Sequence, residues 1–326
     1  MEIKKSMKEQ TFGYGSRRAI IWVLTINLLF CITSIAFSKE GRYKPRFSIK
    51  LTYGTNRYSW GDINKCLESF NNNELFEYVR SYFPELISGE IIKLDNFASD
   101  WEAELRIDII RRFALSLAIS ETIIRKNESS LTYIDRHLIG DQISTYTYKP
   151  EVKVSTPVRL GIYYTLPFSS KININFNAGI GYYSAKVSEY RKLERIYPSG
   201  NSEWVSRHWE TNPKGVFGFH GGIGLEYSLI KNFALVVEVQ RRYAKIKNLN
   251  GIMRGEAKYS EGIYLEWKGA LYFFNMWDLG IGTRYDDLEV WERPPDVSVR
   301  DLVDIRKAVL DLTGYSFRVG IRIRLF

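Results

Sequence analysis

The sequence has few of the residues that build disulfide frameworks, metal centres and nucleophilic active sites. Its 326 residues include only two cysteines and three histidines. Cys31 lies in an amino-terminal apolar segment, so a chain that loses this segment keeps Cys66 alone and forms no internal disulfide or thiolate metal cluster. His220 lies on the polar face of an alternating span, and local spacing places no serine or carboxylate with it, whereas His137 and His208 fall in separate long loops. We therefore expect no enzyme, no metal and no cofactor.

The sequence also lacks a hydrophobic run long enough to cross a membrane as a helix. Its main apolar stretch, residues 19–32, is about fourteen residues long, whereas a spanning helix needs roughly twenty. Five lysines and arginines precede this stretch, and Ala36 and Ser38 are the small residues that a signal peptidase reads. We predict a cleavable signal peptide over residues 1–38, with an uncleaved anchor as the alternative.

Neither repeats, low-complexity tracts nor Pro/Ser-rich linkers divide the remaining residues 39–326, so one domain is predicted. The signal segment carries five cations and two carboxylates, and its removal lowers the formal net charge from +9 to +6. An exported chain of this modest charge gives little reason to expect nucleic acid as a partner.

What the sequence does have is a regular alternation of apolar and polar residues, which predicts β-strands with one apolar and one polar face. Three of the connections between the alternating spans are tight turns, and the other four run from roughly 20 to 70 residues. Short turns at one end and long loops at the other are typical of an up-and-down antiparallel barrel in a membrane. The eight spans are residues 47–54, 101–109, 113–120, 152–166, 172–182, 217–227, 233–242 and 315–326.

Besides the alternating spans and the signal segment, the sequence has a glycine- and asparagine-rich stretch, 174–183, and a terminal Phe326. In these four features the chain resembles the small eight-stranded outer-membrane barrels of the OmpA/OmpX type. It also resembles the broader outer-membrane β-barrel domain family. The resemblance implies an all-β transmembrane barrel in the outer membrane of a Gram-negative bacterium, with both termini in the periplasm. It also implies that the barrel-assembly machinery reads Phe326 as a signal, although the outward apolar file here ends one residue earlier, at Leu325.

The polar faces of the eight spans carry many charges, and in a membrane barrel these faces point into the lumen. Alternation does not say which face is inside, and a lipocalin-type barrel with a buried apolar file is the alternative. The small residues on the polar faces of this chain and its long loops favour the membrane barrel. Eight strands enclose little more than their own side chains, so we expect a salt-bridged, filled lumen, with a small pore as the alternative. The expected lumen charges are Lys50, Glu102, Glu104, Arg106, Asp108, Lys153, Arg159, Glu226, Glu238, Arg242, Arg318, Arg322 and Arg324.

Two of the long connections carry structure of their own. Residues 62–83 have the apolar spacing of two amphipathic helices, with Asp62 as a cap of the first and Asn72 or Asn73 as a cap of the second. These helices pack on the rim of the barrel, on a partner or on the outer leaflet. Residues 248–313 predict a long external loop with a hairpin, and a ten-stranded barrel is the alternative.

The function expected from these features is a structural or surface-interaction role carried by the external loops. The alternatives are a small pore for ions or solutes and, less favoured, a lipid-modifying enzyme of the outer membrane. The expected partners are outer-membrane lipid and lipopolysaccharide, the barrel-assembly machinery, and an extracellular ligand or envelope protein bound by the loops. We expect a monomer.

Overall fold

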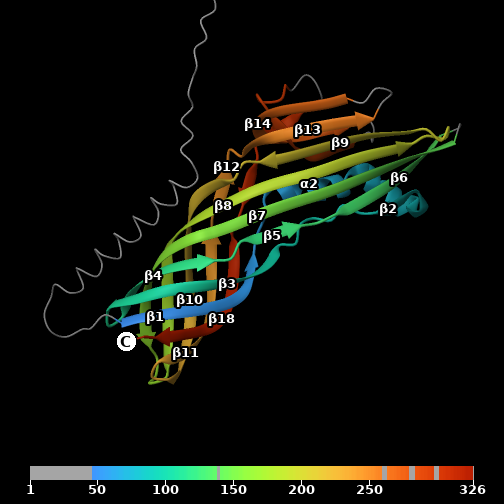
Figure 1. The fold of residues 1–326 in the computed structure, drawn as a ribbon. Helices are drawn as coiled ribbons and strands as arrows, with labels where there is room; N and C mark the ends of the chain where they lie inside the picture. Colours follow the sequence, from blue (N-terminus) through green and yellow to red (C-terminus); the bar gives the residue numbers. More distant parts are fainter. Residues whose placement is uncertain (1–45, 138–139, 259–262, 279–282, 297–300, 326) are drawn as a thin grey trace, which may run out of the picture.

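A computed structural model describes residues 46–137, 140–258, 263–278, 283–296 and 301–325. The predictions for the signal peptide and for Phe326 lie outside these residues. The described chain is almost entirely antiparallel β-sheet, and eight of its strands pair in succession to form a closed ring (Figure 1). In ring order they are β1 (Arg46–Arg57), β3 (Phe97–Ile110), β4 (Phe113–Ser120), β7 (Gly140–Pro167), β8 (Ile172–Ile196), β10 (Lys214–Ile230), β11 (Phe233–Tyr243) and β18 (Gly314–Arg324).

Each of the eight alternating spans of the sequence corresponds to one strand of this ring, the last of them over residues 315–324. The ring is inverted relative to a water-soluble protein, because its apolar side chains face outward. On β1, for example, Leu51 and Tyr53 are exposed whereas Lys50 and Thr52 are buried. The lipocalin arrangement, with the apolar file inside, therefore does not occur in the described strands of the ring.

Tight turns join the ring strands at one end only. Residues 111–112 connect β3 to β4, residues 168–171 connect β7 to β8, and residues 231–232 connect β10 to β11. The first residue of β1, Arg46, pairs with Asp108 beside the first of these turns, and β18 ends at the same end. Among the described residues, no helix has the length and apolar character needed to cross a membrane.

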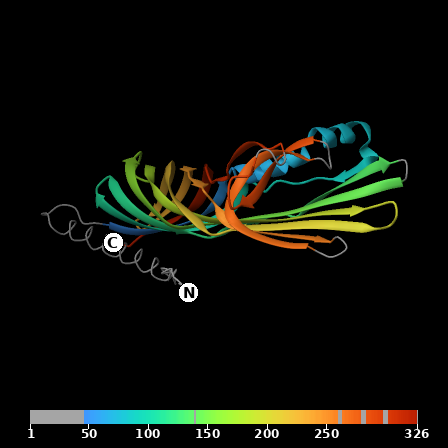
Figure 2. The same cartoon turned by 90° about the horizontal axis from the view of Figure 1, so that it is seen from above.

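At the other end, β7 and β8 run far beyond the ring, and the same sheet continues on both sides of them as a second part of the molecule, which we call the head (Figures 1 and 2). On one side of this hairpin lie β5 (Ile123–Lys126), β6 (Ser129–His137) and β2 (Ile87–Gly89). On the other side lie β9 (Ser202–Thr211), β13 (Asn250–Lys258), β14 (Ile263–Asp278), β15 (Thr283–Trp291) and β16 (Val303–Lys307). Next to these, β12 (Lys245–Lys247) pairs with β17 (Val309–Asp311).

Most of the residues that were expected to form external loops form strands of the head instead. Residues 248–313 form several strands rather than one hairpin, and in the described part of the chain none of them enters the ring, as a ten-stranded barrel would require. The sequence prediction was therefore too simple here, since the sheet as a whole has many more strands than the ring.

A bulge in β7 reverses the two faces of that strand where the ring passes into the head. The register between β7 and β8 shifts between Ser155 and Val158. Below the shift the charged Arg159 points into the ring, whereas above it Val152 and Val154 are buried and Lys153 is exposed. The prediction that Lys153 faces the lumen was therefore wrong, because an inserted residue in one strand exchanges its inward and outward positions.

The two predicted helices are present as α2 (Asp62–Asn71) and α3 (Glu74–Tyr82), followed by a short 3₁₀ turn, η1 (Pro84–Leu86). Asn73 caps α3 by accepting a hydrogen bond of 2.9 Å from the backbone N–H of Phe76. Asp62 does not cap α2 but is its first residue, and Gly61 occupies the cap with a φ of 58°. The Asp62 carboxylate instead binds Arg306 at 2.7 Å.

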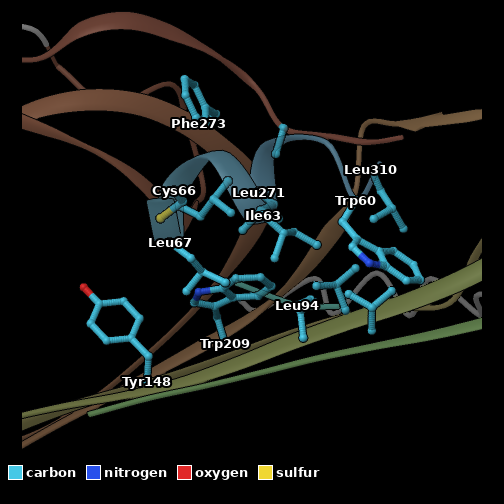
Figure 3. Close-up of a cluster of buried hydrophobic side chains, with 14 of the residues drawn as sticks. Trp60, Ile63, Cys66, Leu67, Leu94, Tyr148, Trp209, Leu271, Phe273 and Leu310 are labelled. Atoms are coloured by element: carbon cyan, nitrogen blue, oxygen red, sulfur yellow. The ribbon is translucent and has the colours of Figure 1, made fainter. Parts of the chain in front are cut away.

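Helix α2 packs on the head of its own chain, and not on a rim of the ring. Its apolar face, formed by Ile63, Cys66 and Leu67, lies in a core with Trp209 of β9 and Leu271 of β14 (Figure 3). All five side chains are nearly inaccessible to solvent. The head therefore has a hydrophobic core separate from the charged interior of the ring.

Candidate functional site

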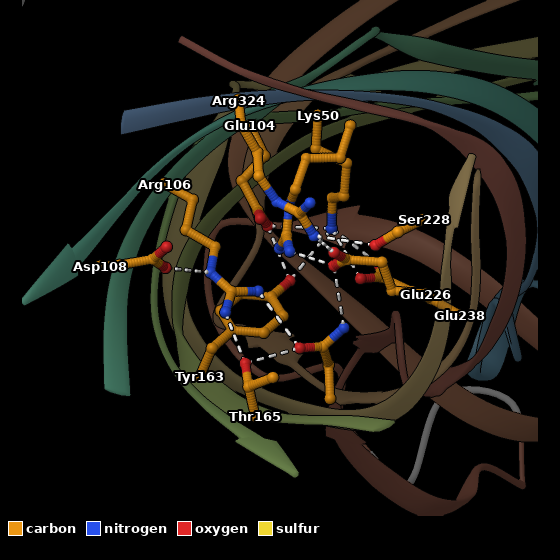
Figure 4. A network of polar contacts seen from close by, with 12 residues as sticks. Lys50, Glu104, Arg106, Asp108, Tyr163, Thr165, Glu226, Ser228, Glu238 and Arg324 are labelled. Carbon is orange, nitrogen blue, oxygen red and sulfur yellow. Dashed lines mark hydrogen bonds and ion pairs between the residues drawn. The ribbon is translucent and has the colours of Figure 1, made fainter. Parts of the chain in front are cut away.

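The interior of the ring holds a dense network of charged side chains (Figure 4). At its centre is Lys50 of β1, which is fully buried. The Lys50 Nζ atom lies 2.7 Å from a carboxylate oxygen of Glu238 on β11 and 3.1 Å from one of Glu104 on β3. It also lies 3.0 Å from the hydroxyl of Tyr163 on β7, and this hydroxyl donates a hydrogen bond of 2.8 Å to Glu104. These contacts join four strands across the bore.

A second group of charges lies on the side of Lys50 nearer the head. Glu102 forms ion pairs with Arg159 and with Arg318, and Arg318 also binds Asp100 at 3.2 Å. Arg318 and Asp100 are two strands apart and face each other across Gly54 of β1. A β-carbon at Gly54 would lie 2.7 Å from the Arg318 side chain, so this glycine leaves the space through which Arg318 reaches Asp100.

A third group lies toward the end with the tight turns. Glu226 of β10 binds both Arg322 and Arg324 of β18. Arg106 of β3 lies 3.1 Å from Asp108 and donates a hydrogen bond of 2.7 Å to Thr165 of β7. The charged network therefore extends along most of the length of the ring.

Arg242 of β11 lies where the interior of the ring meets the head. Its Nε atom donates a hydrogen bond of 2.8 Å to the backbone carbonyl of Leu312, and its guanidinium lies 4.2 Å from the ring centre of Tyr58. Tyr58 and Leu312 belong to the core of the head. These contacts join the charged interior of the ring to the core of the head.

With the exception of Lys153, the expected lumen charges all lie on the inner face of the ring. Sequence reasoning missed Asp100, because the predicted span began at residue 101 whereas β3 begins at Phe97. Asp100 continues the file of Glu102 and Glu104, so extending the alternation by one step would have found it. With Asp100 included, the interior set comprises seven cations and six carboxylates and is nearly neutral. Among the described residues, no group of His, Cys, Asp or Glu side chains is arranged to hold a metal ion.

The head contains a further charged cluster that sequence reasoning did not identify. Arg191 of β8 is buried and forms ion pairs with Glu189 and with Asp287 of β15. It also lies 3.2 Å from the sulfur of Cys66. Burial raises the pKa of the Cys66 thiol well above its usual range, so the thiol stays protonated near neutral pH.

No protein-family model and no curated protein matches the sequence. Among solved structures, the chain is similar to the outer membrane protein OprG from Pseudomonas aeruginosa, with 9% identity over 87% of this chain and 98% of that chain and a TM-score of 0.33. It is also similar to a Pseudomonas aeruginosa FadL homologue, with 7% identity over 86% and 90% of the two chains and a TM-score of 0.18. The chain is also similar to a mutant of the monoaromatic hydrocarbon channel TodX, with 10% identity over 89% of this chain and 91% of that chain and a TM-score of 0.17. Similarity at this level assigns no function to this chain.

Proposed function

We propose that this chain is an outer-membrane protein of a Gram-negative bacterium, in which the ring of eight strands spans the membrane and the head recognises a ligand or partner at the cell surface. The end with the tight turns, where β1 begins and β18 ends, faces the periplasm in this arrangement. Outer-membrane barrels have short turns on the periplasmic side and their larger segments outside.

The apolar outer surface of the ring supports a position in the membrane. Exposed aliphatic side chains would cost free energy in water, roughly 25 cal/mol for each Å² of apolar surface, whereas hydrocarbon accepts them. Aromatic pairs lie at both ends of this surface. Tyr182 and Phe217 are in contact near the head, with ring centres 5.4 Å apart, and Phe113 and Tyr164 are in contact near the turns, 5.1 Å apart. Aromatic girdles at these two levels are typical of membrane barrels.

The single observation that carries the proposed role is the packing of the interior. Lys50, Glu104, Glu238 and Tyr163 bridge the bore from β1 to β3, β7 and β11. Buried charges of opposite sign that are paired and hydrogen-bonded leave no continuous column of water between them. We infer that the ring is a filled anchor and that recognition belongs to the head. The proposed surroundings are lipopolysaccharide and outer-membrane lipid, with assembly by the barrel machinery as a monomer.

Conductance in planar bilayers tests this role against a small pore. The unmodified protein is expected to give no stable unitary current. Replacing Arg318, Arg322 and Arg324 together by glutamine removes three interior cations and is expected to admit water and current. Steady ion-selective steps from the unmodified protein would contradict the filled anchor and support the small pore.

The position in the membrane is tested separately from the role. A folded barrel resists detergent until it is boiled, so the protein in the outer-membrane fraction is expected to migrate differently on gels before and after heating. A protein that fractionates with the periplasm, and shows no such shift, would contradict the membrane assignment.

A further inference from the structure

A cavity of about 330 Å³ lies in the head between the end of α2 and the sheet of β7, β8 and β9. One side of the cavity is aromatic, with Phe70 at the end of α2, Tyr146 and Tyr148 on β7, and Tyr285 on β15. The ring of Phe70 is in contact with all three tyrosine rings, at 5.0 to 5.1 Å between centres. The aromatic wall is therefore packed and fixed in position.

The cavity is also lined by cations. Arg191, Lys192, Arg195 and Arg207 line it, and among the described residues no carboxylate does. Arg191 is occupied by its buried ion pairs, and the guanidinium lies 4.8 Å from the ring centre of Tyr148. Its role is to hold β8, β15 and the aromatic wall together.

Arg207 and Arg195 differ in the ion pairs that they form with other side chains of the protein. Arg207 pairs with Glu289, yet 29% of its side chain stays exposed. The Arg195 side chain is hydrogen-bonded to Tyr197, but within the described parts of the chain it forms no ion pair, and its buried Nε atom has no hydrogen-bond partner there. A buried guanidinium nitrogen without a partner costs free energy, so a group that accepts its hydrogen bond is favoured at this position.

We propose that this cavity binds a small organic anion in which a carboxylate or phosphate is attached to a six-membered ring, as in an acidic sugar. The guanidinium groups of Arg195 and Arg207 bind the acidic group, because planar guanidinium donors match carboxylate and phosphate oxygens. The tyrosine wall packs against the ring of the ligand. The volume lies at the lower end of the range of small-molecule sites, about 300–1,000 Å³, which limits the ligand to about one ring.

This proposal deepens the proposed surface recognition and rests on it, since it supplies the chemistry of the ligand. The experiment is titration calorimetry of the folded mature protein in detergent micelles, with three probes of similar size. The probes are glucuronate, glucose 6-phosphate and the neutral methyl glucoside. We expect one saturable site for at least one of the two anions and no binding of the neutral sugar. Binding of glucuronate alone identifies a carboxylate ligand, and binding of glucose 6-phosphate alone identifies a phosphate ligand.

Variants of one arginine test the position of the site. Arg195→Gln is expected to weaken binding of the anion by about tenfold to a hundredfold, the effect of one charge-assisted hydrogen bond. Arg195→Lys keeps the charge and is expected to recover part of this loss. Arg254→Gln is the matched control, because Arg254 is an exposed head cation that pairs with Glu266 at 2.9 Å and does not line the cavity.

A second variant keeps the charges and removes the space. Leu193 lines the same cavity, and Leu193→Phe is expected to abolish binding while the gel shift of the folded protein stays unchanged. The proposal is wrong if neither anion binds up to millimolar concentration, if the neutral sugar binds equally well, or if Arg195→Gln binds like the unmodified protein. Ligand binding and bilayer current are measured in separate experiments. A pore that binds no ligand gives current but no heat of binding, whereas an anchor that binds no ligand gives neither, so failure of this proposal and failure of the proposed anchor are distinguishable.

Discussion

Replacement of Lys50 by methionine tests whether paired charges hold the ring together. Methionine has nearly the same length but no charge, so the change leaves Glu104 and Glu238 in the interior without their shared cation. Removing one partner of a buried ion pair costs about 3–5 kcal/mol. Glu104 keeps the 2.8 Å hydrogen bond from Tyr163, and Glu238 keeps a weak one of 3.4 Å from Gln240. We therefore expect a loss near the lower limit, about 3 kcal/mol in the free energy of unfolding.

The assay is urea unfolding of the protein in lipid vesicles, followed by the fraction that migrates as folded on unheated gels. The control is the triple variant Lys50→Met, Glu104→Gln, Glu238→Gln, which removes the two carboxylates together with the cation. Neutral groups of similar shape often replace a buried ion pair at little cost. The triple variant is expected to regain most of the lost free energy.

A Lys50→Met variant that unfolds within about 1 kcal/mol of the unmodified protein would refute this reasoning. That result would mean that water already solvates Glu104 and Glu238, because a solvated carboxylate loses little when its partner is removed. Water along the bore is the condition for a small pore, so the stability measurement and the bilayer measurement test the same property of the interior.

Three further predictions concern the outer surface, the packing of the ring and the head. Ile321→Arg places a charge in the apolar belt and is expected to destabilise the membrane-inserted protein by about 2–4 kcal/mol relative to Ile321→Val, and equal refolding of the two would contradict the orientation of the faces. Gly54→Ala brings a β-carbon within 2.0 Å of the carbonyl of Phe317 and is expected to reduce the folded fraction on gels, whereas Gly255→Ala, with nothing nearer than 3.6 Å, is expected to leave it unchanged. Cys66 is buried and its pKa is raised, so in a Cys31→Ala background a thiol reagent is expected to modify it only after unfolding, and rapid labelling of the folded protein would contradict the packing of α2.

The ring could be predicted from the sequence because its physical requirement is periodic. In a ring strand, inward and outward positions alternate at every residue, and the exposed and buried side chains of β11 do so from Phe233 to Tyr243 without interruption. The charged interior followed from the same alternation, because every second residue of a ring strand points inward. Asp100 was missed only because the predicted span was too short.

The central strand β14 of the head could not be predicted in the same way, because its buried residues do not alternate with exposed ones. In β14, the four consecutive residues Leu271, Tyr272, Phe273 and Phe274 are all buried. A strand covered on both faces reads as a continuous apolar run, which period-two reasoning does not distinguish from a loop with aromatic residues. The cavity with Arg195 and Arg207 was missed for a second reason, since it depends on contacts between segments far apart in the sequence.

The hairpin of β7 and β8 shows how one pair of strands serves both parts of the molecule. In β8 the inward positions change from polar Asn175 and Asn177 in the ring to apolar Ala185 and Val187 in the head, although the strand continues without a break. In β7 the inward residues likewise change from polar in the ring to apolar in the head, and there the change occurs at the bulge. In the proposed orientation this reversal lies at the outer boundary of the membrane, because a strand must face its apolar side outward in lipid and inward in water. The continuous hydrogen bonding of the hairpin therefore fixes the head to the ring without a flexible linker, and in the proposed orientation it holds the cavity at a set position outside the membrane.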